Sequence, residues 1–362
     1  MRPHWLRIKL STGKNFNEIK GILRENKLHT VCEEALCPNI GECFEQRTAT
    51  FLILGDACTR KCGFCAVKNG TPFGVDEREP LRIAEAVTKM NLQYVVITSV
   101  TRDDLADGGA SVYAQTIQRI REYVKDCMVE VLIPDFGGSS ESLEIVLNAR
   151  PDIVNHNIET VPRLYPQVRP MADYKRSLEL LKHAKETMTV HPHPHPCPPP
   201  SLRLCSGQAR GRKYSGNKCS PPPVGGVRAC PVLDTGGGGV LLQETVHELT
   251  TKSGLMLGLG EEWHEIISVM QAIRDAGCDI LTLGQYLSPK RDALPIRRYY
   301  TPEEFEILKI EGERMGFKHV ESGPLVRSSY HAKAQRTQRK NFKREKEFTE
   351  ELSSITKSQG LS

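Results

Sequence analysis

From Phe51 onwards the sequence alternates short apolar runs with amphipathic stretches, and this alternation leaves few folds open to the chain. The apolar runs have strand length and occur at Phe51–Leu54, Tyr94–Thr98, Val129–Ile133, Ile153–Ile158, Ser253–Leu259 and Asp279–Leu283. Helical stretches are expected at about 79–90, 111–126, 139–149, 174–187, 261–277 and 302–315. Repeated strand–helix units form parallel sheets with right-handed crossovers, so the pattern predicts an α/β fold. Six units without a G-x-G-x-x-G fingerprint favour a partial (βα)6 barrel of the TIM type over a Rossmann sheet.

Three cysteines crowd the loop that follows the first predicted strand. Cys58, Cys62 and Cys65 form a C-x3-C-x2-C pattern directly after the apolar run that ends at Gly55. Iron–sulfur clusters normally take four thiolates, so three on one loop predict a cluster with one open iron. The alternatives are a zinc knuckle that lacks a ligand and a chance grouping. Zinc sites usually combine two C-x2-C or Cys/His pairs, and no second pair follows closely here.

A second cysteine triplet precedes the first predicted strand. Cys32, Cys37 and Cys43 have C-x4-C-x5-C spacing, and Pro38 and Gly41 predict a turn-rich loop rather than a helix interior. This triplet also lacks a fourth ligand nearby, which leaves a structural zinc site as the alternative. Two incomplete triplets in quick succession suggest two iron–sulfur clusters with different tasks. Before them, apolar spacing predicts a helix over Asn15–Arg24, with Asn15 as its N-cap.

Composition narrows the class of protein. The chain has 362 residues, and a formal net charge of +5 does not by itself argue for nucleic-acid binding. No apolar run reaches the roughly 18 residues needed to cross a membrane, and the N-terminus has no pattern of a secretory signal. The 12 cysteines therefore point to a reducing compartment and to metal chemistry rather than disulfides. Cys127 and Cys278 stand apart from the others and are expected to be small buried hydrophobes.

One segment interrupts the strand–helix pattern. Residues 190–249 are rich in proline and glycine and hold little apolar material, which predicts a disordered insertion. An alternative is that the segment is not native coding sequence. Its cysteines have spacings that match no compact zinc site: Cys197, Cys205, Cys219 and Cys230. The expected domains are an N-terminal extension over 1–50, a barrel over 51–322 with this interruption, a motif over 323–332, and a basic, partly disordered tail over 333–362.

The C-x3-C-x2-C loop, with the aromatic residue Phe64 before its last cysteine, resembles the signature of the radical SAM superfamily. Further stretches resemble the lipoyl synthase family within that superfamily. They are Val31–Cys43, Thr98–Ala110, His156–Val161, Leu281–Tyr286 and Gly323–Tyr330, the last of which contains the sequence Arg-Ser-Ser-Tyr. The resemblance covers residues 1–189 and 250–332.

The resemblance implies a division of labour between two [4Fe–4S] clusters. Cys58, Cys62 and Cys65 would hold the cluster that binds and cleaves S-adenosylmethionine to release a 5′-deoxyadenosyl radical. The auxiliary cluster would be the sulfur donor, with four protein ligands: Cys32, Cys37, Cys43 and Ser329. Arg327 is expected to help hold that serine. Candidates for the cofactor and substrate pocket, or alternatively for capping helices and holding loops, are Asp103, Asp104, Asn157 and Glu159.

The implied reaction is the insertion of two sulfur atoms at C6 and C8 of an octanoyl group that is amide-linked to a lysine. The implied partners are carrier domains, such as those of 2-oxoacid dehydrogenase E2 and the glycine-cleavage H protein, and a ferredoxin- or flavodoxin-type reductant. The expected compartment is the cytoplasm. The rival hypotheses are another sulfur-inserting radical SAM enzyme that resembles biotin synthase, a product made inactive by the interruption at 190–249, and a zinc-binding interaction protein.

Overall fold

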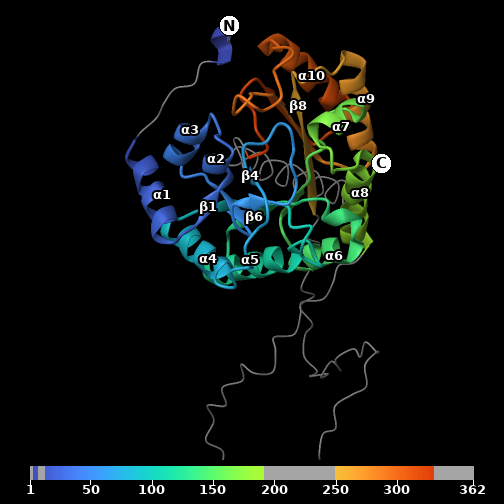
Figure 1. Cartoon of the computed structure of the whole chain (residues 1–362). Helices are drawn as coiled ribbons and strands as arrows, with labels where there is room; N and C mark the ends of the chain where they lie inside the picture. Colours follow the sequence, from blue (N-terminus) through green and yellow to red (C-terminus); the bar gives the residue numbers. More distant parts are fainter. Residues whose placement is uncertain (1–2, 7–12, 191–248, 330–362) are drawn as a thin grey trace, which may run out of the picture. The chain divides into compact units, whose positions relative to one another are not determined.

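The apolar runs form one mostly parallel sheet (Figure 1). The structure is a computed structural model that describes residues 3–6, 13–190 and 249–329. The strands of the sheet are β1 His29–Thr30, β2 Thr50–Ile53, β5 Tyr94–Ser99, β6 Met128–Leu132, β7 Ile153–Asn155, β8 Thr250–Leu257, β9 Ile280–Gln285 and β10 His319–Gly323. Their order is β1-β2-β5-β6-β7-β8-β9-β10, and every pair is parallel except β1 with β2. The predicted α/β class with a partial barrel is confirmed.

Helices connect the parallel strands and cover the outer face of the sheet. The longer helices are α1 Lys14–Glu25, α4 Glu79–Lys89, α5 Ala110–Tyr123, α6 Ser140–Asn148, α8 Tyr174–Val190, α9 Trp263–Asp275 and α10 Pro302–Arg314. Shorter pieces are α2 Val31–Glu34, α3 Ile40–Glu45, α7 Tyr165–Val168 and the 3-10 turns His4–Leu6, Phe136–Gly138 and Pro162–Leu164. Figure 1 shows α4, α5 and α6 side by side along the sheet, and α4 packs on α5, and α5 on α6.

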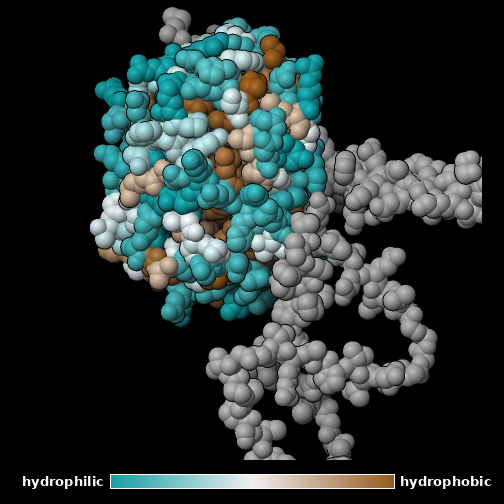
Figure 2. All heavy atoms as spheres, turned by 90° about the vertical axis from the view of Figure 1, so that its right-hand side faces the viewer, coloured by the Kyte–Doolittle hydropathy of each residue, from teal (hydrophilic) through white to brown (hydrophobic). Residues whose placement is uncertain are grey.

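The strands are buried on both faces, which explains their continuous apolar runs. In β5 the outward-facing Val95 and Ile97 belong to a large core with the helices, whereas Tyr94 and Val96 form a small inner cluster with Ile153. The inner face also carries charged side chains, described below. The face drawn in Figure 2 is mainly hydrophilic, with apolar residues showing between the polar ones down its middle. In the described part of the chain, no helix has both the length and the apolar character to cross a membrane.

Local sequence signals set several helix ends. Thr301 and Glu304 form a reciprocal capping box at the start of α10, with Pro302 at its first position. Gly277 follows α9 with φ of 83°, a left-handed conformation that costs glycine little. The helix predicted over 261–277 therefore starts two residues late and ends at Asp275.

The structure corrects several predicted boundaries. The helix expected over Asn15–Arg24 spans Lys14–Glu25 and is preceded by Gly13, so Asn15 lies inside it and donates to the Glu45 carbonyl at 2.9 Å. The strand expected over Ile153–Ile158 ends at Asn155, and β10 is an additional strand that pairs with β9. Cys127 and Cys278 are 1% and 0% exposed, which confirms that they are buried.

Part of the predictions falls outside the described residues. These are the interruption over 191–248 with its four cysteines, Tyr330 of the Arg-Ser-Ser-Tyr sequence, and the tail over 333–362.

Candidate functional site

The first cysteine loop is held at the carboxyl end of β2 by two very short strands. β3 Ala57–Cys58 pairs in parallel with β4 Lys68–Asn69, so the two ends of the cysteine loop lie side by side. Between them, the Gly63 N–H donates to the Val168 carbonyl at 2.9 Å. A Cβ on Gly63 would lie 2.8 Å from the Gln167 carbonyl oxygen, so only glycine fits this approach.

Two backbone amides point at the sulfur of Cys58. The N–H of Arg60 donates to its Sγ at 3.4 Å, and the N–H of Thr101 donates at 3.3 Å. Hydrogen bonds of this kind stabilise a thiolate and set the potential of a cluster that it ligates. The sulfur of Cys58 therefore accepts hydrogen bonds both from its own loop and from the segment that follows β5.

The three thiols of this loop are close enough for their charges to interact. Burial raises the pKa of Cys62 to about 12, the nearby Arg169 opposes this shift, and Cys65 and Cys58 add to it. Burial also raises the pKa of Cys65, and the backbone of Val67 opposes it. A metal that bound through Cys62 and Cys65 would therefore have to displace their protons, as is usual for thiolate ligands.

The donor set fits a cluster better than a single ion. All eight cysteines of the described residues are free thiols. Within those residues, no three His, Cys, Asp or Glu side chains converge on one point as ligands of a single metal ion would. A tetrahedral zinc site needs such convergence, whereas a [4Fe–4S] cube places each thiolate on a different iron.

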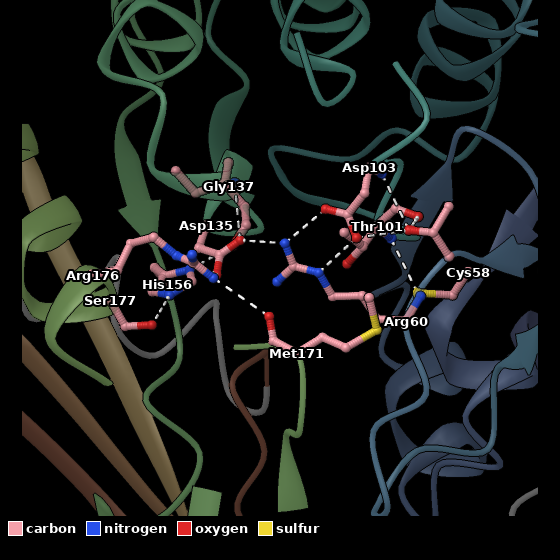
Figure 3. A network of polar contacts seen from close by, with 12 residues as sticks. Cys58, Arg60, Thr101, Asp103, Asp135, Gly137, His156, Met171, Arg176 and Ser177 are labelled. Atoms are coloured by element: carbon pink, nitrogen blue, oxygen red, sulfur yellow. Dashed lines mark hydrogen bonds and ion pairs between the residues drawn. The ribbon is translucent and has the colours of Figure 1, made fainter. Parts of the chain in front are cut away.

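An ion-pair network links the cysteine loop to two strand ends (Figure 3). Arg60 donates from Nε and Nη2 to the two carboxylate oxygens of Asp103, at 2.8 and 2.7 Å. Its Nη2 also lies 2.8 Å from Oδ1 of Asp135, which follows β6 and is fully buried. Arg176 of α8 donates to the other oxygen of Asp135 at 3.0 and 2.6 Å. Burial raises the pKa of Asp135, but Arg60 and Arg176 outweigh it and hold the pKa well below the usual range.

His156 lies beside this network and is neutral. Burial and the charge of Arg169 lower the pKa of His156 to about 4. Its Nδ1 lies 2.8 Å from the Ile133 carbonyl, so Nδ1 carries the proton and Nε2 accepts from the Ser177 hydroxyl at 3.0 Å. The ring thus braces the end of β7 against α8 without adding charge.

The other predicted pocket residues have separate partners. Asp104 accepts two hydrogen bonds from the buried Arg102, at 2.9 and 2.8 Å. Glu159 has a left-handed backbone, with φ of 69°, and burial raises its pKa. Asn157 exchanges hydrogen bonds with the Ser328 hydroxyl at 2.7 and 3.1 Å. Asp103 and Glu159 thus lie by the first cysteine loop, whereas Asp104 and Asn157 pair elsewhere.

Arg169 was not among the predicted site residues. Its Nη1 donates to the Asn157 carbonyl at 2.8 Å, and its guanidinium lies over the Tyr165 ring, 5.7 Å from the ring centre. Its Nε is buried and has no hydrogen-bond partner among the described residues. A half-buried cation with a spare buried donor next to Cys62 is suited to hold an anionic group. The sequence gives no signal for this role because Arg169 lies in an irregular turn after α7.

The second triplet lies mostly on short helices, which corrects the prediction of a turn-rich loop. Cys32 is on α2 and Cys43 is on α3, and only Cys37 lies in the turn between them. The Thr30 side chain accepts from the Glu33 N–H and so caps α2. Burial raises the pKa of Cys32, and Cys37 raises it further. The three sulfurs therefore form a second compact group, with a pKa of about 12 for Cys43.

The far end of the chain reaches this second group. The Asn39 amide donates to the Leu325 carbonyl at 2.7 Å, across 286 positions of sequence. Burial raises the pKa of Cys37, while the backbone of Asn39 and the charge of Arg327 oppose that shift. Arg327 is therefore near Cys37. Ser329 is half-buried and is the last residue described.

Comparison with known proteins gives the family. The radical SAM superfamily model matches residues 52–192, and the model of the N-terminal domain of lipoyl synthase matches residues 1–37. Lipoyl synthase of Rubrobacter xylanophilus is 50% identical over 334 residues, which are 92% of this chain and 86% of the relative. Lipoyl synthase of Koribacter versatilis is 47% identical over 92% of this chain and 91% of the relative.

This chain belongs to the lipoyl synthase family. The expected resemblance is thereby confirmed, and the superfamily implies S-adenosylmethionine and a [4Fe–4S] cluster as cofactors. Among solved structures, methylornithine synthase matches with a TM-score of 0.42 and 9% identity, over 84% of this chain and 81% of that chain. In a member of the lipoyl synthase family, the two cysteine groups are the first candidates for the sites of the reaction.

Proposed function

We propose that this member of the lipoyl synthase family converts a protein-bound octanoyl-lysine into lipoyl-lysine. The observation that carries the proposal is the pair of cysteine groups, one at the mouth of a radical SAM barrel and one joined to the C-terminal end of the described chain. When bound, the cofactors supply a carbon radical that removes hydrogen from C6 and C8 of the octanoyl chain and the sulfur that is inserted there.

The first group would hold the cluster that binds S-adenosylmethionine, through Cys58, Cys62 and Cys65. The amides of Arg60 and Thr101 would orient the sulfur of Cys58. The spare donor of Arg169 suits the carboxylate of S-adenosylmethionine.

The polar residues predicted for the pocket would then divide into two sets. Glu159 and Asp103 would lie nearest to that cofactor, because Glu159 influences the pKa of Cys62 and Asp103 pairs with Arg60. Asp104 would shape the loop after β5 through its pair with Arg102.

The second group would hold the auxiliary cluster, through Cys32, Cys37 and Cys43. Ser329 would supply the fourth ligand, and the contact between Asn39 and Leu325 supports this, because it brings the C-terminal segment to the cysteine helices. An alkoxide from serine is a harder ligand than a thiolate, which suits a cluster that gives up sulfur. Arg327 would balance the negative charge of this cluster from beside Cys37.

The substrates would be octanoylated carrier domains, with those of 2-oxoacid dehydrogenase E2 and the glycine-cleavage H protein as the first to test. A ferredoxin- or flavodoxin-type protein would deliver the electrons. The substrate class follows from the names of the relatives, all lipoyl synthases.

Anaerobic reconstitution followed by iron, sulfide and product analysis tests the proposal. Two clusters require about eight iron atoms per chain, since each cube holds about four. Incubation with S-adenosylmethionine, a reductant and an octanoylated peptide should release 5′-deoxyadenosine and give the lipoyl product by mass. About four iron atoms with deoxyadenosine but no lipoyl product would leave a radical SAM enzyme of another kind. Stoichiometric zinc in a colourless sample would exclude both lipoyl synthase activity and a radical SAM enzyme of another kind.

A further inference from the structure

Two opposite charges are buried on the inner face of the sheet. Lys252 of β8 and Glu130 of β6 each have a side chain that is 0% exposed, and Nζ lies 3.1 Å from Oε1. Burying such a pair costs several kcal/mol per ion before their attraction is counted, and apolar residues often serve stability as well. A buried pair at this position therefore calls for a role beyond stability.

Neighbouring strands hold the carboxylate of Glu130 in place. The Tyr94 hydroxyl of β5 donates to Oε2, and the Asn155 amide of β7 donates to Oε1 at 2.8 Å. With Lys252, three strands contact the one carboxylate, so it has a single arrangement. A fixed carboxylate in turn fixes the ammonium group that it pairs with.

The Lys252 ammonium group also donates a hydrogen bond to a residue outside the sheet. Its Nζ donates to the backbone carbonyl of Ser328 in the C-terminal segment. The Ser328 hydroxyl is held separately by the amide of Asn157, at 2.7 and 3.1 Å. Ser328 is therefore held at its backbone by Lys252 and at its side chain by Asn157.

The sheet makes room for the segment that carries Ser328. A Cβ on Gly284 of β9 would lie 2.2 Å from the Val326 carbonyl oxygen, closer than real contacts allow. On Gly254 of β8 it would lie 2.4 Å from Oγ1 of Thr282 and 3.1 Å from Oδ1 of Asn157, the residue that holds the Ser328 hydroxyl. Glycine at position 284 thus lets the backbone at Val326 lie against the inner face of the sheet.

We propose that Lys252 and Glu130 are positioning residues that anchor Ser328 and so deliver Ser329 to the auxiliary cluster. The inference rests on the proposed role of Ser329 as the fourth ligand. Consecutive Cα atoms are about 3.8 Å apart, so holding Ser328 confines Ser329 to a small volume. Serine is a weak ligand for iron compared with cysteine, and a weak ligand gains most when its effective concentration is raised.

The obvious variant, Lys252→Met, leaves the Glu130 carboxylate buried without its cation and risks unfolding. The double variant Lys252→Met/Glu130→Gln removes both charges and keeps an amide for Tyr94 and Asn155, so it is the main test. Lys182→Met is the control, since Lys182 forms an exposed pair with Glu186 on α8.

Hydrogen exchange of the cluster-free chain provides the first readout. In the double variant, the peptide that covers residues 324–329 should lose about tenfold of its protection, which corresponds to about 1.4 kcal/mol. Peptides from β5 and β6 should keep theirs, which shows that the sheet is intact. Unchanged protection of 324–329 would overturn the proposal, and so would equal losses across the whole sheet, because the pair would then serve stability alone.

The reconstituted protein provides the second readout, by Mössbauer spectroscopy and iron content. The double variant should lose one iron per chain, from about eight to about seven, and release 5′-deoxyadenosine at the normal rate. It should match Ser329→Ala, and combining the changes should add nothing further, since both remove the same ligand. A normal auxiliary spectrum in the double variant would overturn the positioning role.

Failure of the underlying function gives a different pattern. If the wild-type chain itself held about four iron atoms or gave no lipoyl product, the proposed function would fall. If wild type were complete but Ser329→Ala kept a normal auxiliary spectrum, only the ligand role of Ser329, and with it this inference, would fail.

Discussion

The Arg60 guanidinium lies 2.8 Å from the Asp135 carboxylate, and this contact ties the radical SAM cysteine loop to the end of a strand two places away in the sheet. Asp135 is fully buried and Arg60 is 8% exposed at its side chain, so water screens the pair little. Arg176 closes the arrangement from α8 (Figure 3). The loop is therefore held by charge from outside as well as by its own backbone.

We expect Asp135→Asn to slow radical formation. The change leaves Arg60 and Arg176 without their shared carboxylate, and breaking a buried pair costs roughly 3–5 kcal/mol. Release of 5′-deoxyadenosine should fall by about tenfold or more, since displacement of a positioned loop is costly. Glu122→Gln, at an exposed pair with Arg119, is the matched control. It should change neither the stability of the protein nor the release of 5′-deoxyadenosine. Wild-type rates in Asp135→Asn would show that the cysteine loop keeps its position without the Asp135 carboxylate.

Substitution of Arg169 should weaken binding of S-adenosylmethionine. Arg169→Met removes the buried donor beside Cys62 and keeps the aliphatic bulk over Tyr165. A charge-assisted hydrogen bond is worth about 1.5–3 kcal/mol, so KM for S-adenosylmethionine should rise at least about tenfold. Steady-state deoxyadenosine release against cofactor concentration measures this. An unchanged KM would place the carboxylate elsewhere.

Ser329→Ala should separate the two halves of the reaction. The first cluster is bound by other residues, so release of 5′-deoxyadenosine should continue. Lipoyl product should fall by at least about tenfold, because the auxiliary cluster loses its proposed fourth ligand. Mass spectrometry of the peptide and of the nucleoside in one sample gives both numbers. Normal lipoyl product would refute the assignment of Ser329.

Acid should remove a stabilising contribution at Asp279, the residue that precedes β9. Burial raises the pKa of Asp279, but Lys185, the Thr251 N–H and Lys318 outweigh it, so the net pKa is lowered. Lys185 Nζ lies 2.9 Å and Lys318 Nζ 3.0 Å from this buried carboxylate. A group with a lowered folded pKa stabilises the protein above its unfolded pKa of about 3.9 and loses that effect as pH falls through the folded value.

Thermal unfolding of wild type and Asp279→Asn checks this sign. At pH 7 the variant should be less stable by about 1.5–3 kcal/mol. The difference should shrink as pH falls below about 4. A gap that stayed constant from neutral to acid pH would mean that the charge of Asp279 is not what stabilises.

Removal of residues 190–248, with a short glycine–serine linker in their place, should leave activity equal or higher. The helix before the segment and the strand after it already meet, since Lys185 Nζ donates to the Leu249 carbonyl at 3.2 Å. A short connection is therefore sufficient, and shortening a flexible loop lowers its closure entropy by only a few kcal/mol. Lipoyl product per reconstituted chain is the measure. Complete loss of product would show that the segment is structural.

The fold was predictable where one local pattern carried it. Parallel strands buried on both faces are continuous apolar runs, and β5 and β9 were placed to within a residue or two for that reason. β10 was missed because His319, Glu321 and Ser322 give it no apolar run. The short helices α2 and α3 were missed because Pro38 and Gly41 signal turns, and a helix of four residues has almost no periodicity.

Residue type and spacing predict the two cysteine groups, and their role as cluster ligands stays a prediction. Asp135 and Lys252 have partners far away in the sequence, and Arg169 affects the pKa of the distant Cys62, so no local pattern predicts these contacts. The pairing of Asn157 with Ser328, 171 positions later, is likewise a contact that no local pattern predicts, and its expected place in the cofactor and substrate pocket stays a prediction. The roles of the predicted site residues stay predictions until the variants above are measured.

The contact between Asn39 and Leu325 has a consequence for how the protein is made. The first cysteine loop is complete within eight residues and is supported by neighbouring strands, so it can take up iron once the first half of the barrel has folded. The proposed auxiliary site needs both the cysteine helices and the segment at Leu325, so it cannot form until parts of the chain 286 positions apart have both been synthesised. The two proposed clusters would then be loaded in two stages, the sulfur-donating one last. A chain that stopped before Leu325 would form the substrate radical without a sulfur donor to react with it.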